Sequence, residues 1–216
     1  APPPAPSPPP TEPDAGVIDH DRFVGHLAVG YMGISQIPIG DAGMGGTINA
    51  PVVGARYWFK RDIGIDGGVG FAFSSGSSTD GAGQSRDLPS QFGFAIHAGV
   101  PFNLGYGKHY KFQVVPELNL GLSTATLKSE GNPDVSLSGL RFDLGARAGV
   151  EIHFGFIGVP ELALQASVGL YLRHDSRSAT PAGGASSGES TTILATSVQS
   201  DPWALFSNNI SALYYF

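Results

Sequence analysis

Apolar residues alternate with small or polar residues over most of the chain beyond about residue 20. In the clearest run the order is strict: Leu140, Phe142 and Leu144 alternate with Arg141 and Asp143. This period of two is that of a β-strand with one apolar and one polar face. Eight such runs predict eight strands, of which the first and last alternate less regularly. They span about 22–34, 53–59, 63–73, 92–100, 112–122, 140–153, 161–172 and 203–216.

The connections between these runs alternate in length. Long Gly- and Ser-rich loops are expected at 35–50, 74–90, 128–135 and 175–200, and short links at 60–62, 103–108 and 155–158. In an antiparallel meander this order places every long loop at one end of the sheet and every short link at the other. The pattern therefore predicts an all-β protein with up-and-down topology.

The apolar rows of such a sheet face either an interior or a lipid bilayer. In a soluble barrel they face inward, whereas in a membrane barrel they face lipid and the polar rows fill the interior. Most of the runs have about 9–14 residues, which favours the membrane, because a spanning strand needs about 9–11 residues and soluble strands average about 5–6. The polar rows hold charges that we expect to form an interior network. These charged residues are Arg56, Asp66, Glu117, Arg141, Asp143, Arg147, Glu151, Glu161 and Arg173.

The width of an eight-stranded barrel bears on what its interior does. About eight strands leave room for little more than side chains. The sequence therefore favours a closed interior, with a narrow pore for small solutes as the alternative.

Composition narrows the function classes further. Charged residues make up 14% of the chain, against about 25% in ordinary soluble domains. No stretch of about 18 residues stays apolar, which argues against transmembrane helices. The net charge of -6, with scattered basic residues, argues against nucleic-acid binding. The absence of Cys excludes disulfides and thiolate chemistry.

Aromatic side chains gather near the short links and the C-terminus. This clustering is typical of an aromatic girdle at one membrane interface. Its expected members are Tyr57, Phe59, Phe102, Tyr106, Tyr110, Phe112, Phe154, Phe156, Tyr214, Tyr215 and Phe216. Three of the four lysines, Lys60, Lys108 and Lys111, are expected beside it, among head groups and water.

The C-terminus carries a recognisable motif. Apolar or small residues alternate as Ile210, Ala212 and Tyr214 before a terminal Phe216. This resembles the signal of bacterial outer-membrane β-barrels, and the resemblance implies recognition by the barrel-assembly machinery. The region 20–216 looks like a small eight-stranded barrel of the OmpA, OmpX and OmpW type. The resemblance implies contact with outer-membrane lipids of a Gram-negative envelope, and an even strand number places both termini in the periplasm.

The N-terminal segment differs from the rest. Residues 1–16 hold eight of the 17 prolines, which favours polyproline II and predicts a periplasmic tail ahead of a barrel at 17–216. Ala1, without an initiator Met, is what removal of a signal peptide after a small residue would leave. Because polyproline II loses little entropy on binding, we expect the tail to dock on a protein partner or a second copy of the chain.

One short motif suggests catalysis. His174 and Ser176 lie two residues apart on an apolar row, which resembles the outer-membrane lipid A deacylases, with Glu189 as the nearest acid. A His could deprotonate such a Ser for attack on an acyl ester. Arg177 follows where that family has Asn, so we expect a polar strand end rather than an enzyme. Three of the six His residues lie on three different runs and the other three lie near strand ends, so we also expect no metal site and no cofactor. The sequence thus predicts a non-enzymatic, structural or anchoring outer-membrane protein that binds an envelope partner.

Overall fold

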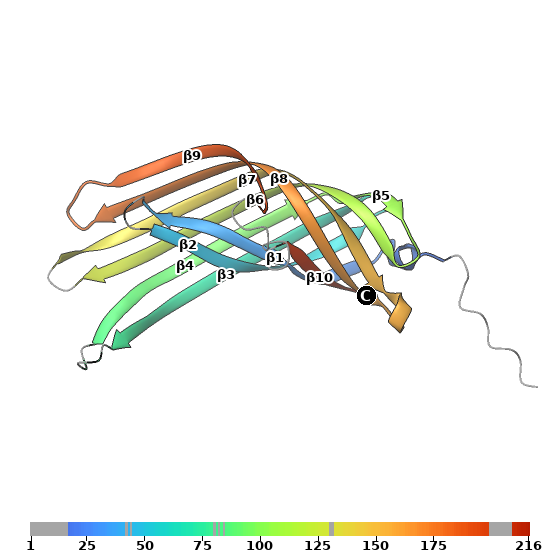
Figure 1. The fold of residues 1–216 in the computed structure, drawn as a ribbon, viewed down its shortest axis with the longest axis horizontal. Helices are drawn as coiled ribbons and strands as arrows, with labels where there is room; N and C mark the ends of the chain where they lie inside the picture. Colours follow the sequence, from blue (N-terminus) through green and yellow to red (C-terminus); the bar gives the residue numbers. More distant parts are fainter. Residues whose placement is uncertain are drawn as a thin grey trace, which may run out of the picture.

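The computed structural model describes residues 17–41, 43, 45–79, 81, 83, 85–129, 132–198 and 209–216. The Pro-rich segment 1–16 therefore lies outside the described residues. The rest is almost entirely β-structure (Figure 1). The strands are β1 (Leu27–Gly40), β2 (Gly45–Trp58), β3 (Gly64–Thr79), β4 (Ser85–Gly99), β5 (Phe102–Tyr106), β6 (Tyr110–Ser129), β7 (Asn132–Phe154), β8 (Val159–Pro181), β9 (Ser187–Thr196) and β10 (Ile210–Tyr215). Two 3-10 helices accompany them, η1 (Asp19–Phe23) and η2 (Gly155–Ile157).

The strands form one antiparallel sheet that closes on itself. Their order is β10-β1-β2-β3-β4-β6-β7-β8-β9, and β10 also pairs with β8, which completes the ring. The predicted all-β, antiparallel fold is therefore confirmed. Within the described residues no helix is long and apolar enough to cross a membrane.

The described residues form ten strands, where the sequence predicted eight. A break at Pro101, which has no amide hydrogen to donate, separates β4 from β5, and β5 continues along the same neighbour, β6. Similarly, β9 and β10 both lie along β8. Each extra strand thus shares a neighbour with the strand that precedes or follows it.

The predicted long loops are largely strands, which corrects that part of the sequence analysis. The expected loop 74–90 forms the end of β3 and the beginning of β4, and the expected loop 175–200 contains the end of β8 and all of β9. Their Ser, Gly and Thr residues suggest loops by composition. In the second of these segments, however, small apolar residues such as Ala179 and Ala195 are buried.

Both described ends of the chain lie where the strand connections are short. The terminal Phe216 donates its amide hydrogen to the carbonyl of Leu27 (2.9 Å), and its carbonyl oxygen contacts Nδ1 of His26. We call this end of the molecule the short-turn end and the opposite end the long-hairpin end (Figure 1).

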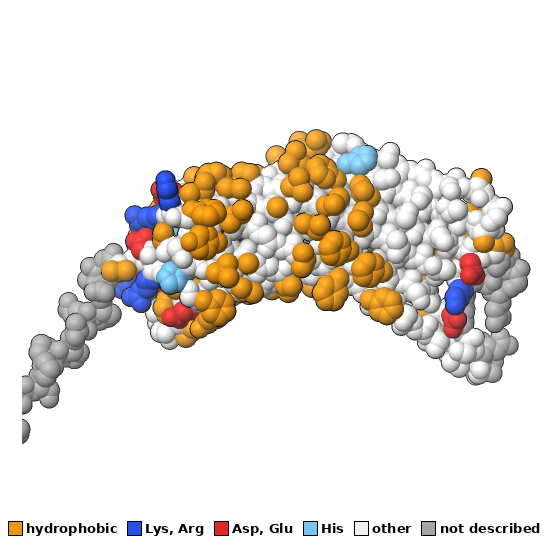
Figure 2. All heavy atoms as spheres, turned by 180° about the vertical axis from the view of Figure 1, so that it is seen from behind, with side chains coloured by type: hydrophobic (Ala, Val, Ile, Leu, Met, Phe, Trp, Pro, Cys, Tyr) orange, Lys and Arg blue, Asp and Glu red, His pale blue; other side chains and the backbone are white. Residues whose placement is uncertain are grey.

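In the half near the short-turn end, charges face inward and apolar residues face outward. The cross-strand row Leu118, Leu144 and Leu172 is exposed, whereas the neighbouring Asp143 and Arg147 are buried. Apolar side chains cover much of the outer surface there (Figure 2). We call this surface the apolar belt; its members on β7 are Leu140, Phe142, Leu144, Ala146, Ala148, Val150 and Ile152.

Toward the long-hairpin end the polarity of the sheet inverts. Ala125, Leu137 and Ala179 point inward and are buried with Ile39 and Ile48. Hydroxyl side chains occupy the outward rows at this level, including the paired Ser138 and Ser178, whose oxygens are 2.8 Å apart. The sequence did not predict this inversion, because residues 35–50, 128–135 and 175–200 were expected to form loops.

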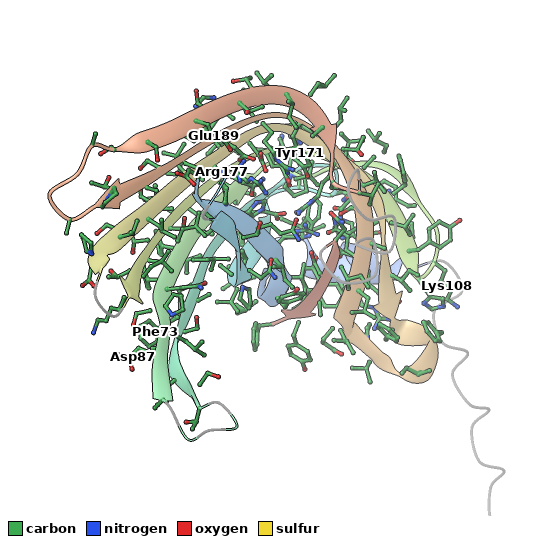
Figure 3. All side chains as sticks on the ribbon, turned by 60° about the vertical axis from the view of Figure 1, so that its left-hand side comes forward. Phe73, Asp87, Lys108, Tyr171, Arg177 and Glu189 are labelled. Carbon is green, nitrogen blue, oxygen red and sulfur yellow. The ribbon has the colours of Figure 1, made fainter. Side chains whose placement is uncertain are left out.

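The inversion follows from the position of one hairpin. Beyond Tyr31, β1 no longer pairs with β10, and before Val52, β2 does not pair with β3 among the described residues. These parts, Gly33–Gly40 of β1 and 45–51 of β2, are called the inner hairpin. It lies on the concave side of the curved sheet formed by β3, β4 and β6–β9 (Figure 3). Two β-layers enclosing an apolar core explain why hydroxyl groups face outward here.

Candidate functional site

The centre of the interior is a fully buried ion network around Arg56. Its guanidinium binds both oxygens of Asp66, at 2.7 Å each, and also pairs with Glu151. Arg56 and Asp66 are direct cross-strand partners on β2 and β3, whereas Glu151 reaches across from β7. Lys111 Nζ lies 3.0 Å from Glu151 Oε1, and the Tyr215 hydroxyl donates to the same oxygen (2.9 Å). Charges this deeply buried are tolerated because each has opposite charges and hydrogen bonds at close range.

Aromatic rings cover this network on the side of the short-turn end. Lys111 Nζ lies 3.9 Å from the ring centroid of Trp58, and Trp58 Nε1 donates to the Tyr215 hydroxyl (3.1 Å). Phe23 of η1 stacks on Tyr215, with ring centroids 4.7 Å apart. Together, these side chains and η1 fill this mouth of the ring.

His20 of η1 connects the helix to the wall. Lys111 Nζ donates to His20 Nδ1 (3.0 Å), and Nε2 donates to the Arg61 carbonyl (2.9 Å). Burial, and then the Lys111 charge, lower the pKa of His20 to about 3. The imidazole is therefore neutral at pH 7, as its hydrogen bond from Lys111 requires.

A second set of ion pairs continues the network toward the long-hairpin end. Arg147 bridges Asp66 (3.1 Å) and Glu117 (3.2 Å), and the Tyr171 hydroxyl donates to Glu117 (2.7 Å). Two bidentate pairs follow between β7 and β8. They are Arg173–Asp143, at 2.8 and 3.0 Å, and Arg141–Asp175, at 2.7 Å for both contacts.

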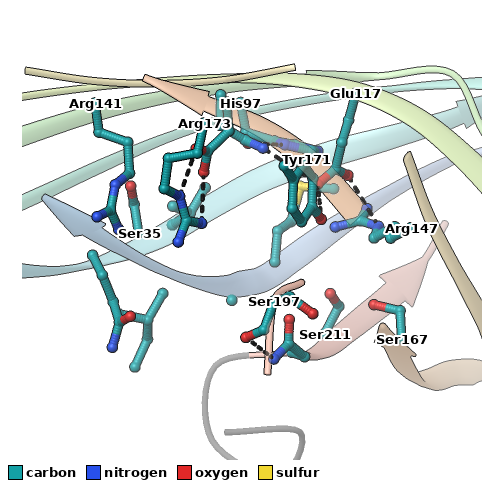
Figure 4. A pocket seen from close by; sticks show the side chains of 18 of the residues that line it. Ser35, His97, Glu117, Arg141, Arg147, Ser167, Tyr171, Arg173, Ser197 and Ser211 are labelled. Carbon is teal, nitrogen blue, oxygen red and sulfur yellow. Dashed lines mark hydrogen bonds and ion pairs between the residues drawn. The ribbon is translucent and has the colours of Figure 1, made fainter. Parts of the chain in front are cut away.

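Most members of these pairs line a small polar cavity of about 120 Å³. In Figure 4, Arg173, Tyr171 and Arg147 lie on one side of it, and Ser167, Ser197 and Ser211 on the other. The inner hairpin contributes Ser35 and Gln36 to its lining. His97 also lines it, and its Nδ1 donates to Asn119 (2.7 Å). The cavity is large enough for a few water molecules or a very small solute.

The structure brings together nearly all the predicted interior charges. Arg56, Asp66, Glu117, Arg147 and Glu151 form one connected cluster, and Arg141, Asp143 and Arg173 form the cross-strand pairs beside it. Glu161 instead lies half-buried near the start of β8, apart from these pairs.

Several members of the network were not predicted. Lys111, expected among the head groups, is fully buried, and Tyr215, expected in the aromatic girdle, points into the interior. The alternation could have predicted that both face inward. Lys111 and Gln113 share a row with Glu117, and Tyr215 lies one residue from the outward Tyr214.

The structure does not assemble the suggested deacylase residues. His174 and Ser176 lie on the outward row of β8, and His174 Nδ1 contacts the Thr192 hydroxyl at 2.8 Å. Glu189 on β9 lies opposite Arg177 of β8, not opposite Ser176, and forms an ion pair with Arg177. Odd and even positions of a strand point to opposite faces, so Glu189 is directed away from His174. The described residues also contain no group of three side chains placed to hold a metal ion.

The residues of the C-terminal motif share one face of β10. Tyr214 and Phe216 are exposed, whereas the intervening Leu213 and Tyr215 are buried. Ile210 and Ala212 are half-buried members of the same row.

A closed antiparallel ring with an ion network inside and an apolar belt outside is the architecture of a transmembrane β-barrel. The predicted resemblance to small outer-membrane β-barrels is confirmed at this level of architecture. No family model and no curated protein matches the sequence.

Two solved structures are similar to the chain. One is Ail, the attachment invasion locus protein of Yersinia pestis, at 16% identity and a TM-score of 0.40, covering 88% of this chain and 97% of that one. The other is a major outer membrane protein from Thermus thermophilus, at 14% identity and a TM-score of 0.44, covering 88% and 98%.

Proposed function

We propose that the chain is a barrel of a bacterial outer membrane whose wall has eight strand positions, since β4 and β5 share one position and β9 and β10 share another. We further propose that both termini lie in the periplasm and that the protein acts as a non-enzymatic anchor with a closed interior. The observation that carries this proposal is the pairing of the apolar belt with the buried network around Arg56. An exposed row such as Leu118, Leu144 and Leu172 is costly in water and favourable in lipid.

The filled interior favours an anchor over a pore. Near the short-turn end, Trp58, Tyr215 and η1 occupy the mouth, and toward the other end the inner hairpin packs against apolar side chains. The cavity between them is too small to serve as a continuous aqueous channel.

Refolding into lipid vesicles tests both parts of the proposal. We expect the protein to partition into the vesicles, to give a β-type circular dichroism spectrum and to migrate differently on a gel with and without heating. In planar bilayers we expect no discrete conductance steps. A protein that stays soluble without detergent would contradict the membrane assignment, whereas regular conductance steps would favour the narrow-pore alternative.

We further propose that the segment 1–16 binds a protein partner or a second copy of the chain in the periplasm. Eight prolines remove eight backbone donors, so this segment is unsuited to joining a sheet edge and suited to a groove on another polypeptide. Anchoring and docking would then belong to separate parts of the chain.

Deleting residues 1–16 is expected to leave folding and heat-modifiable migration unchanged, because the ion network lies entirely within the ring. Native mass spectrometry of complexes captured from the envelope should show the loss of one assembly. A deletion variant that retains every assembly of the full chain would contradict the docking proposal.

A further inference from the structure

Among the described residues, strand pairing joins the inner hairpin to the ring at its base. Its two strands pair with each other from Ile34↔Pro51 to Gly40↔Gly45, and over this length they pair with no other strand among the described residues. A β-bulge between Tyr31 and Gly33, with φ of 119° at Gly33, marks the point where β1 leaves the wall. The hairpin therefore has a defined hinge.

The inner face of the sheet has a glycine seat for this hairpin. A Cβ atom added at Gly93 would lie 2.8 Å from Ile48 Cγ2, and one at Gly121 would lie 2.8 Å from Ile37 Cγ1. At Gly139 it would collide with the carbonyl oxygen of Pro38. A side chain at Gly139 would exclude the hairpin, whereas one at Gly93 or Gly121 would force the facing isoleucine to shift, so the seat depends on small residues at these positions.

Polar contacts between described residues join the hairpin and its turn to the surrounding sheet. The Ser123 hydroxyl donates to the Pro38 carbonyl (2.6 Å), and the Ser187 hydroxyl donates to Asp41 (2.6 Å). Apolar packing of Ile37, Ile39 and Ile48 also contributes to this interface. Such an interface can part without breaking a β-ladder.

The edge of β3 is a second position at which the hairpin could pair with the ring. Beyond Gly70, β3 pairs with β4 alone among the described residues, which leaves the other edge of β3 without a strand partner within this part of the chain. The register of β2 and β3 runs through Val52↔Gly70 and Val53↔Val69. If the same register continued along both strands, Ala50 would lie opposite Ala72 and Ile48 opposite Ser74.

We propose that the inner hairpin is a gate that moves between its glycine seat and the edge of β3. In the seat it buries apolar side chains, and at the edge it gains the backbone hydrogen bonds of an extended ladder. One position is stabilised by apolar burial and the other by backbone hydrogen bonds, so the hairpin has two alternative packed states. Because Ser35 and Gln36 line the polar cavity, outward movement opens the cavity around Arg173 and Asp143 to small hydrophilic solutes from the long-hairpin end.

Paired cysteines test the two positions, since the chain has no Cys of its own. Ile48→Cys with Gly93→Cys traps the seated hairpin: the Cβ atom added at Gly93 lies 3.5 Å from Ile48 Cβ, within the range of about 3.5–4.5 Å for a disulfide. Ile48→Cys with Ser74→Cys traps the outward hairpin. We expect the first pair to oxidise rapidly and the second to oxidise more slowly but completely, because each outward movement is captured.

A third substitution shifts the balance. Gly139→Val places a side chain against Pro38 and should speed cross-linking of the Ser74 pair severalfold while slowing that of the Gly93 pair. Gly67→Val is the matched control, because a Cβ at Gly67 meets nothing within 4 Å, and it should change neither rate.

Two results would overturn the proposal. If the Gly93 pair forms and the Ser74 pair never does, even with Gly139→Val, the hairpin is a fixed plug. If only the Ser74 pair forms, the hairpin belongs to the wall. Cross-linking is measured on protein that shows the folded gel band in detergent, so its outcome is separate from the vesicle test of the proposed function.

Discussion

Replacing Arg56 by methionine is expected to lower the free energy of unfolding by about 3–5 kcal/mol, the range for removing one partner of a buried ion pair. The Arg56 side chain is completely buried and neutralises both Asp66 and Glu151. Methionine retains most of the apolar stem, so the loss reports the charge more than the packing. Without Arg56, two carboxylates stay in a low-dielectric interior with less compensation.

Urea titration in detergent micelles, followed by tryptophan fluorescence, measures this loss. Arg61→Met is the matched control, since Arg61 pairs with Asp21 at 2.9 Å on the exposed surface of the short-turn end. Exposed pairs contribute about 0–1 kcal/mol, so this variant should remain close to the unmodified protein. Equal losses in the two variants would show that the interior network does not stabilise the barrel.

The alternation of side chains predicted the faces of the strands well in one half of the molecule. On β7, Arg141, Asp143 and Arg147 face inward, and Leu144 faces outward, as the period of two requires. The strand partners follow from the same meander, because neighbouring runs pair antiparallel. Local sequence is sufficient for these features since each depends on only one or two adjacent strands.

The inner hairpin could not be predicted in this way. Residues 35–50 were expected to form a loop, and even an alternating pattern there would not show whether a hairpin lies in the wall or inside it. That choice depends on Gly93, Gly121 and Gly139, which come from three other strands and provide space only when the sheet curves around the hairpin. Composition was misleading as well, because hydroxyl residues that face water on a strand resemble those of a loop.

The network around Arg56 illustrates the same limit. Arg56 and Asp66 are cross-strand neighbours, and a register of β2 and β3 would predict their contact. The contact between Arg56 and Glu151 spans 95 residues and crosses the interior. It depends on the diameter of the ring and the tilt of its strands, and neither can be inferred from the alternation of side chains.

Replacing Leu144 by arginine is expected to destabilise the membrane-inserted protein by about 2–4 kcal/mol, the cost of a cation near the bilayer midplane on the lipid face of a barrel. Leu144 is 50% exposed and lies near the middle of the outward row of β7, between Leu118 and Leu172 on the adjacent strands. The measurement is the unfolding free energy in lipid vesicles, from reversible urea titration. The same substitution in water would expose a charge at no comparable cost.

Ser138→Arg is the control that locates the edge of the apolar belt. Ser138 lies on the same strand and the same outward face as Leu144, but in the half where hydroxyl residues replace apolar ones and Leu137 points inward. If the polarity inversion marks the membrane boundary, an arginine at position 138 reaches water or head groups and costs about 0–1 kcal/mol. A large loss of unfolding free energy at both positions would indicate that lipid contacts the whole strand. A small loss at both would indicate that the apolar belt does not face the bilayer. A large loss for Leu144→Arg together with a small loss for Ser138→Arg would support a barrel with one half in the membrane and the other half in water.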